Sequence, residues 1–249
     1  MEGFQTLWRA HSDTINEALL SRWWSGERRE FTLKTDLFDE AVNNGLIPAL
    51  ESRTKHLLGM DASHTVLQMA KRRYPNLQMI SADVRSLPFV NGAFDGIVSN
   101  STLDHFKSVD ELHAALKELH RVLRPGGQLI LTLDNPTNPI IFLRNILPYG
   151  VLRKINVVPY YVGRTLSARK LNYLLKELGF HQLETDAILH CPRILAVILA
   201  FWMERYASRK MQQRFLSFLK SFEKLAKLPT RFLTGNFVAV RCYRGGSKE

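Results

Sequence analysis

The strongest constraint on the fold is the alternation of strand-like and helix-like segments through the first half of the chain. Short apolar runs typical of buried strands cover residues 31–35, 55–60, 77–81, 96–100 and 128–133. Helical spacing covers residues 46–52, 63–73 and 109–123. Parallel strands need crossover connections of this kind. The order therefore predicts an α/β fold, a Rossmann-like three-layer sandwich with a mostly parallel sheet between two layers of helices.

Acidic residues follow three of the predicted strands, at Asp36, Asp61 and Asp83. In an open parallel sheet, ligands bind over the carboxyl ends of the strands. An acid that ends the second strand can accept hydrogen bonds from both ribose hydroxyls, which favours Asp61. Asp83 can accept from an adenine amine while the backbone N–H of Val84 donates to a ring nitrogen. The alternative is that each acid only caps the helix after its strand.

The first crossing, "TDLFDEAVNNG", carries Asp36, Asp39 and Glu40 and has no glycine before Gly45. A pyrophosphate site needs exposed backbone amides without nearby carboxylates, so these acids argue against a dinucleotide. An S-adenosylmethionine ligand carries a sulfonium and an ammonium group, and an acidic crossing attracts both. The alternative is that Asp39 and Glu40 face solvent at the start of a helix.

Three further motifs carry a family resemblance: "GMDASHTVLQMAKRRYP", "SADVRSLPFVNGAFDGIVSNSTLDHF" and "ELHRVLRPGGQLILTL". With these motifs, residues 31–134 resemble class I S-adenosylmethionine-dependent methyltransferases of the small-molecule type, including those of quinone biosynthesis. The resemblance implies about seven strands, the last one antiparallel, and S-adenosylmethionine as the cofactor. It also implies a set of cofactor-binding residues: Asp36, Phe38, Glu40 and Ala41 at the methionine end, Asp61 and Ala62 at the ribose, Asp83 and Val84 at the adenine, and Ser99 and Asn100 near the sulfonium.

The first motif departs from the family pattern of an acid followed by Gly-x-Gly-x-Gly. Asp36 matches the acid, but Phe38 and Glu40 replace two glycines, and only the displaced Gly45 can serve as the last. The loop is therefore expected to follow a different path, with Lys34 or amides near Gly45 taking the cofactor's carboxylate. A methyltransferase-like protein that has lost its cofactor site is the alternative.

The segment "SNSTLDHF" after the fourth strand contains the candidate catalytic residue, His105. An unperturbed imidazole titrates near neutrality and can act as a general base. The alternative is that His105 caps or orients the following helix. Methyl transfer from a sulfonium is an in-line displacement in which positioning supplies much of the acceleration, so a base is not obligatory. The later segment "DNPTNP" lacks the aromatic residue of the nucleic-acid amino-methyltransferase motif.

Positive charge is concentrated in the second half of the chain. Residues 140–249 carry 19 Lys and Arg against 6 Asp and Glu, whereas residues 1–139 carry 15 against 17. Residues 208–227 place Phe215, Phe218 and Phe222 on one helical stripe with lysines largely off it, and "ILAVILAFWM" precedes them. Such a helix can pack on its own core or lie in a membrane interface. A hydrophobic, lipid-like acceptor would explain both the apolar and the cationic character.

The chain is expected to be one methyltransferase domain, residues 1–249, with three additions around a shared core. They are an N-terminal helical cap at 1–30, with its helix starting at a Thr14–Glu17 capping box, and insertions at 138–165 and 191–236 that cover the acceptor. The predicted function is methyl transfer to a small, hydrophobic or lipid-like acceptor. An RNA-modifying enzyme that uses the basic half is the rival, although the aromatic residues follow the core-facing period instead of lying among the cations.

The remaining sequence features bear on location and partners. No run reaches the roughly 18 apolar residues of a membrane span, and the N-terminus lacks an apolar secretory core. Cys191 and Cys242 match no metal spacing, so no metal site is predicted. We expect a cytoplasmic protein with peripheral membrane contact through its basic half and without nucleic acid as a partner.

Overall fold

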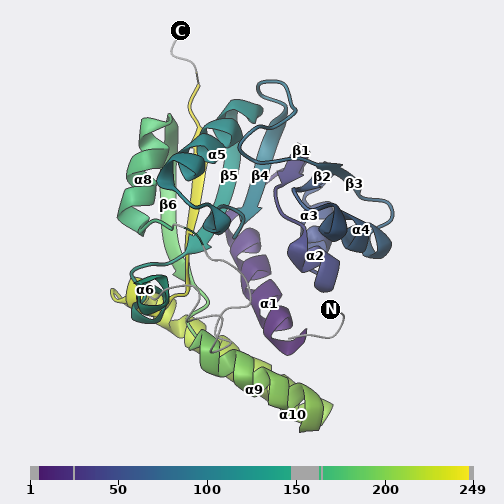
Figure 1. Ribbon diagram of the computed structural model, residues 1–249, viewed down its shortest axis with the longest axis vertical. Helices are drawn as coiled ribbons and strands as arrows, with labels where there is room; N and C mark the ends of the chain where they lie inside the picture. The colour runs from purple at the N-terminus through teal and green to yellow at the C-terminus, as the bar shows by residue number, and fades with distance from the viewer. Residues whose placement is uncertain (1–5, 25, 147–162, 164, 247–249) are drawn as a thin grey trace.

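The structure is a computed structural model that describes residues 6–24, 26–146, 163 and 165–246. Its centre is one seven-stranded sheet with the order β3-β2-β1-β4-β5-β7-β6 (Figure 1). The strands are β1 Arg29–Lys34, β2 Thr54–Asp61, β3 Gln78–Ser81, β4 Phe94–Asn100, β5 Leu123–Asp134, β6 Phe180–Ile188 and β7 Phe237–Arg244. Only β7 runs antiparallel to its neighbours, which confirms the predicted fold class.

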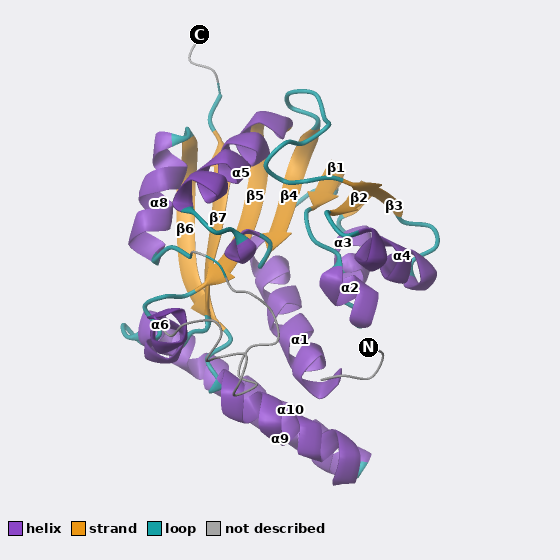
Figure 2. Ribbon diagram, viewed as in Figure 1, coloured by secondary structure: helices purple, strands orange, loops and turns teal. Residues whose placement is uncertain are grey.

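Helices cover both faces of the sheet, as Figure 2 shows. The α-helices are α1 Thr6–Trp23, α2 Phe38–Val42, α3 Ile47–Glu51, α4 His64–Arg73, α5 Val109–Val122, α6 Pro139–Ile146, α8 Ala168–Glu177, α9 Arg193–Tyr206, α10 Arg209–Ser221 and α11 Arg231–Thr234. Two 3₁₀ turns, η1 Leu103–His105 and η2 Phe222–Lys227, complete the described elements. Helices α5 and α8 share one apolar core with one face of the sheet, while α1, α3, α9 and α10 share another with the opposite face.

Strand β5 shows how the two cores are separated. Leu129, Leu131 and Leu133 belong to the core under α5 and α8, whereas Ile130 belongs to the core under α1. This follows from the period of two in a strand, because successive side chains point to opposite faces. Both faces of residues 129–133 of β5 are buried by helices, so this part of the strand is apolar at every position except Thr132.

Helix α5 forms where its sequence pattern predicts. Ser108 caps its first turn and Glu111 returns a hydrogen bond to the Ser108 backbone, which makes a complete capping box. Its buried positions include Leu112, Leu116 and Leu119, spaced three and four residues apart along one face. The helix ends at Val122, and β5 begins at the next residue.

The predicted start of the N-terminal helix was wrong. The helix α1 begins at Thr6, and Thr14 lies inside it with its hydroxyl donating to the Ala10 carbonyl. Leu7 and Trp8 pack into the same core as the later turns of α1, so tertiary burial extends the helix past the local capping signal. Helix α1 thus lies against α9 and α10 as well as the sheet.

The two predicted insertions contribute α6 and the α9–α10 hairpin, meaning residues 193–221. Figure 1 shows this hairpin extending away from the sheet beyond the arrowheads of the parallel strands, on the side where α6 also lies. Residues 147–162 and 164 of the first insertion lie outside the described residues. No helix among the described residues is long and apolar enough to cross a membrane.

Candidate functional site

The candidate site is the rim of the sheet, meaning the carboxyl ends of β1, β2, β4 and β5. Asp61 ends β2 and is buried, and its two oxygens accept backbone N–H groups from two different segments. Its Oδ2 accepts from the Leu37 N–H at 3.1 Å, and its Oδ1 accepts from the Ser63 N–H at 2.8 Å. Asp61 therefore fixes the β1 crossing to the start of α4, and each oxygen retains accepting capacity for a ligand hydroxyl.

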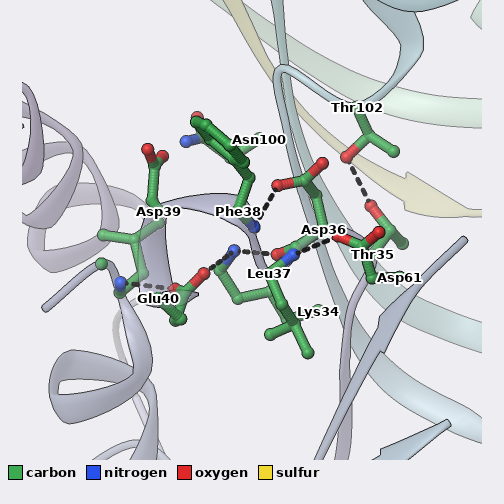
Figure 3. Close-up of polar contacts among 12 residues, drawn as sticks. Lys34, Thr35, Asp36, Leu37, Phe38, Asp39, Glu40, Asp61, Asn100 and Thr102 are labelled. Atoms are coloured by element: carbon green, nitrogen blue, oxygen red, sulfur yellow. Dashed lines mark hydrogen bonds and ion pairs between the residues drawn. The ribbon is translucent and has the colours of Figure 1, made fainter. Parts of the chain in front are cut away.

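Asp36 lies beside Asp61 at the end of β1 (Figure 3). Its Oδ1 accepts from the Phe38 N–H at 2.9 Å. Burial raises the pKa of Asp36 to about 7, with Lys34 opposing the rise and Asp61 adding to it. Among the ion pairs of the described residues, none involves Asp36 or Asp61. The carboxylates of Asp36 and Asp61 at the rim thus lack a salt-bridge partner among the described residues. A cationic ligand bound beside them would lower the electrostatic energy of the rim.

Beneath the rim, Lys34 and Glu40 form a fully buried ion pair, with 2.9 Å between Lys34 Nζ and Glu40 Oε2. Lys34 Nζ also donates to the Asp36 carbonyl, and Glu40 Oε1 accepts from the Leu46 N–H at 2.8 Å. Burial alone would lower the pKa of Lys34, but Glu40, Asp36 and Asp39 together raise it. The expectation that Glu40 and Lys34 face the cofactor therefore differs from the structure, where each engages the other and the loop backbone.

Gly45 is required by this buried pair. Its φ is +58°, and a Cβ atom built on it would lie 2.3 Å from Glu40 Oε1. Glycine alone gives both the left-handed backbone and the space for the carboxylate. The last glycine of the first motif thus serves an internal ion pair, and the β1 crossing is held by side-chain charge where the family pattern has glycines.

Helix α1 closes over the same crossing from the other side. Arg9 pairs with Asp39 at 2.8 Å and its guanidinium lies over the Phe38 ring, 4.9 Å from the centroid. Asp13 Oδ2 accepts from the Asn43 side-chain amide at 2.8 Å and from the Gly45 N–H at 3.2 Å. Arg9 and Asp13 were not among the predicted residues, because about 30 residues separate them from their partners and no local pattern indicates the contact.

The predicted adenine end has a competitor for its carboxylate. Arg85 binds Asp83 at two points, with Nε 3.0 Å from Oδ1 and Nη2 2.6 Å from Oδ2. Arg85 holds the pKa of Asp83 below its usual range. A ligand amine would therefore share Asp83 with this guanidinium. At the predicted adenine end Val84 is buried, whereas at the predicted ribose end Ala62 is exposed.

At the end of β4, Ser99 is fully buried and accepts from the Thr35 hydroxyl at 3.0 Å. Asn100 Oδ1 accepts from the Thr132 hydroxyl at 2.6 Å, and Asn100 also lines a small cavity beneath α1 with Asn16 and Leu46. Ser99 therefore holds Thr35 in place beneath the rim. Asn100 therefore lies where the end of β4 meets α1.

The turn after β4 brings His105 and a buried acidic pair together. His105 is exposed on η1. Its neighbour Asp104 is buried, with Oδ2 accepting from the Ser101 hydroxyl at 2.9 Å and Oδ1 from the Asp134 N–H at 3.1 Å. Burial, with Asp134 adding to it, raises the pKa of Asp104 to about 8. Asp104 was not among the predicted residues; it fixes the turn that carries His105.

Asp134, at the end of β5, is where the two insertions meet the rim. Its Oδ2 is 2.8 Å from Arg144 of α6, and its Oδ1 is 3.6 Å from Arg193 of α9. The next residue, Asn135, donates to the Phe232 and Gly235 carbonyls. Its side chain therefore fixes the chain leading into β7, in agreement with rejecting an amino-methyltransferase motif here.

Part of the candidate site lies in a segment that matches a known protein family. Residues 43–131 match the methyltransferase domain family. The demethylmenaquinone methyltransferase of Chlorobaculum parvum is 29% identical over 174 residues, covering 64% of this chain and 69% of that protein. The Staphylococcus saprophyticus enzyme of the same name is 35% identical over 91 residues, covering 35% of this chain and only 38% of its own length.

The fold has a solved counterpart in a Haemonchus contortus phosphoethanolamine N-methyltransferase in complex with S-adenosylhomocysteine. That likeness has a TM-score of 0.59 at 17% identity, over 93% of this chain and 52% of the other. This structural likeness shows a shared arrangement of sheet and helices and does not indicate the acceptor. Together with the family match over residues 43–131, it supports the resemblance seen in the motifs to class I S-adenosylmethionine-dependent methyltransferases and shows their fold.

Proposed function

We propose that this chain methylates a hydrophobic, quinone-like acceptor of the demethylmenaquinone kind. The observation that carries the proposal is the acidic rim formed by Asp36 and Asp61, which lack ion-pair partners among the described residues. The likeness to two demethylmenaquinone methyltransferases supports the acceptor class. The apolar and basic segments around the rim suit an acceptor with a lipid tail better than a small polar one.

The residues at the rim fit the cofactor. When bound, S-adenosylmethionine supplies the methyl group from its sulfonium. Asp61 would hold the ribose through the accepting capacity that Leu37 and Ser63 leave free. Asp36 would attract the cationic end by charge, and the Val84 N–H with Asp83 would bind the adenine.

The remaining predicted residues would position the crossing or line the methionine end. Glu40 positions the crossing through Lys34, and Ser99 positions Thr35. Phe38, more than a third exposed beside Arg9, would give the methionine end an apolar wall. Ala41 is buried under the loop. The main catalytic contribution would be alignment of acceptor and methyl group, with His105 placed on η1 to accept a proton from the acceptor.

Calorimetry with S-adenosylmethionine and S-adenosylhomocysteine tests the cofactor part. Asp61→Asn should weaken binding, whereas Glu27→Gln, an exposed acid at the opposite end of β1, should not. Mass spectrometry of a short-chain demethylated quinol incubated with protein and cofactor tests the acceptor part, where a gain of one methyl group is expected. Binding without transfer to any quinol would reject the acceptor class, and no binding would favour the non-catalytic alternative.

A further inference from the structure

Helix α9 turns a broad apolar surface away from the protein. Seven of its large side chains are exposed, and we call them the outward face of α9: Ile194, Leu195, Ile198, Leu199, Phe201, Trp202 and Tyr206. Leu195 is 56% exposed, Trp202 53% and Tyr206 68%. Water-facing helices are normally polar on this side, and a contiguous apolar patch marks a binding surface.

The opposite side of α9 shows that the helix is firmly placed. Ala196 and Ala200 are buried, and they allow close packing in the core that also includes α1 and α10. Glu204 Oε1 accepts from the Leu7 N–H at 2.5 Å and fixes the far end of α9 to α1. Packing of the opposite side therefore fixes the orientation of α9. Its small side chains face the core and its large ones face away from it.

Charge decides which partner suits this surface. The α9–α10 hairpin carries six Lys and Arg and one Glu. The cations of α10, such as Arg209, Lys210 and Arg214, are exposed on the helix that packs against α9. A second copy of the hairpin would bring like charges together, whereas anionic lipid headgroups complement them. Trp202 and Tyr206, whose rings stack at 5.4 Å, are the residue types that favour the boundary between headgroups and acyl chains.

The outward face belongs to a hairpin on the same side of the sheet as the candidate site. Helix α6 also exposes apolar side chains, including Phe142, Leu143 and Ile146. Asp134 pairs with Arg144 in the last turn of α6 and with Arg193 at the start of α9, so both helices have a residue at the end of β5. Figure 1 shows α6 and the hairpin on the carboxyl side of the sheet. A surface docked through α9 would thus lie beside the rim.

We propose that the outward face of α9, with the cations of α10, docks this protein onto an anionic lipid bilayer. The contact is interfacial, with the apolar side chains entering about 5–10 Å below the headgroups. The inference deepens the proposed function, on which it rests for one point: an acceptor dissolved in the bilayer reaches the rim without crossing water. Docking itself depends only on the hairpin.

Flotation of the full-length protein with vesicles tests the docking. Vesicles of phosphatidylcholine with phosphatidylglycerol should carry the protein upward, and vesicles of phosphatidylcholine alone should carry it at least about tenfold less, with salt weakening the difference. Trp202 supplies an internal probe, because Trp8, Trp23 and Trp24 are buried. Its emission should shift to the blue on binding, and Trp202→Phe should remove that shift.

A matched pair of variants locates the surface. Ile198→Glu with Trp202→Glu should abolish flotation, while Tyr173→Glu, at a 65% exposed aromatic of α8, should float like the native protein. Thermal melts confirm that each variant is folded. Native protein that stays at the bottom, or a double variant that floats normally, overturns the proposal. So does a native dimer, or a complex with single-stranded RNA, that the double variant abolishes while vesicles are ignored.

The same preparations separate this inference from the proposed function. Calorimetry with S-adenosylmethionine reports on the rim and does not depend on vesicles. A protein that binds the cofactor but not the vesicles would lose the docking proposal alone. A protein that floats but ignores the cofactor would lose the proposed function and keep the docking surface.

Discussion

The β1 crossing and the α9–α10 hairpin both depart from the usual pattern of apolar residues inside and charged residues outside. In the crossing, the charged side chains of Lys34 and Glu40 lie inside, fully shielded from water. In the hairpin, Leu195, Ile198 and Trp202 lie outside. A buried charge is tolerated only when its partners are all in place, and an exposed apolar face only when something else covers it. The first therefore indicates internal architecture, and the second indicates an external partner.

The two regions also differ in what a substitution should do. Changes within the crossing should alter stability and cofactor binding, because its buried ion pair and several of its backbone N–H groups have fixed partners. Changes on the outward face of α9 should leave stability nearly unchanged and alter only association.

Removing one partner of the buried pair should be the most damaging change. Lys34→Met leaves Glu40 charged and unpaired, and breaking such a pair costs about 3–5 kcal/mol. Urea unfolding monitored by circular dichroism measures the loss. The double variant Lys34→Met with Glu40→Leu should recover most of it, since no charge is then buried. A single variant as stable as the native protein would show that Glu40 has an unforeseen route to solvent.

Gly45→Ala should be the next most damaging, at about 2–3 kcal/mol, because the new methyl group strains the backbone and displaces Glu40 from the Leu46 N–H. Gly126→Ala is the matched control. Gly126 also has a positive φ, +74°, but nothing lies within 4 Å of its added Cβ, so about 1 kcal/mol is expected. Equal losses in the two variants would mean that the Glu40 contact contributes little.

Asp61→Asn should weaken S-adenosylmethionine binding by ~10- to 100-fold, the value of one or two charge-assisted hydrogen bonds. The amide keeps one acceptor for the Leu37 or Ser63 N–H, so the melting temperature should fall only slightly. Calorimetry at fixed pH measures the affinity, and Glu27→Gln provides the comparison. Unchanged affinity with a lower melting temperature would make Asp61 a capping residue only.

The titration of Asp36 should give binding a pH dependence. Burial raises the pKa of the Asp36 carboxyl from 3.8 to about 7 in the folded protein. Between these two pH values the folded state therefore holds a proton that the unfolded state has released. The contribution of Asp36 to stability therefore falls as pH rises through this window. Affinity for the cationic cofactor should rise about tenfold between pH 6 and 8 as Asp36 ionises.

Asp36→Asn should flatten that profile. Asp13 also has a pKa raised by burial to about 7, but its bonds go to Asn43 and Gly45 beneath α1, so Asp13→Asn should retain the Asp36-dependent rise. A profile that survives in Asp36→Asn and disappears in Asp13→Asn would assign the titration to the α1 contact.

The smallest effect should come from the outward face. Leu195→Gln replaces a side chain that is 56% exposed, and its unfolding free energy should change by less than about 0.5 kcal/mol. Ala196→Gln, one residue along but buried, should cost several times more by overpacking the core shared with α1. Similar losses in the two variants would show that the outward face is covered within the monomer.

Much of the fold could be predicted from the sequence because its signals are local. The alternation of strands and helices, the Ser108 cap of α5 and the acids that end β1 and β2 all depend on residues within a few positions of one another. The candidate site could be predicted less completely. Asp36 and Asp61 lie at the rim as expected, but Arg85 binds Asp83, and Glu40 turns inward.

Periodicity and strand-end residues lie within short stretches of the chain, so the sequence specifies the succession of strands and helices and the acidic character of the rim. Contacts between distant segments specify that Lys34 and Glu40 are buried, that Asp13 binds the Gly45 N–H across 32 positions, and that α9 presents its large side chains outward. The reason is that burial depends on everything packed around a residue. The same apolar helix is core or surface according to which of its faces the rest of the chain covers.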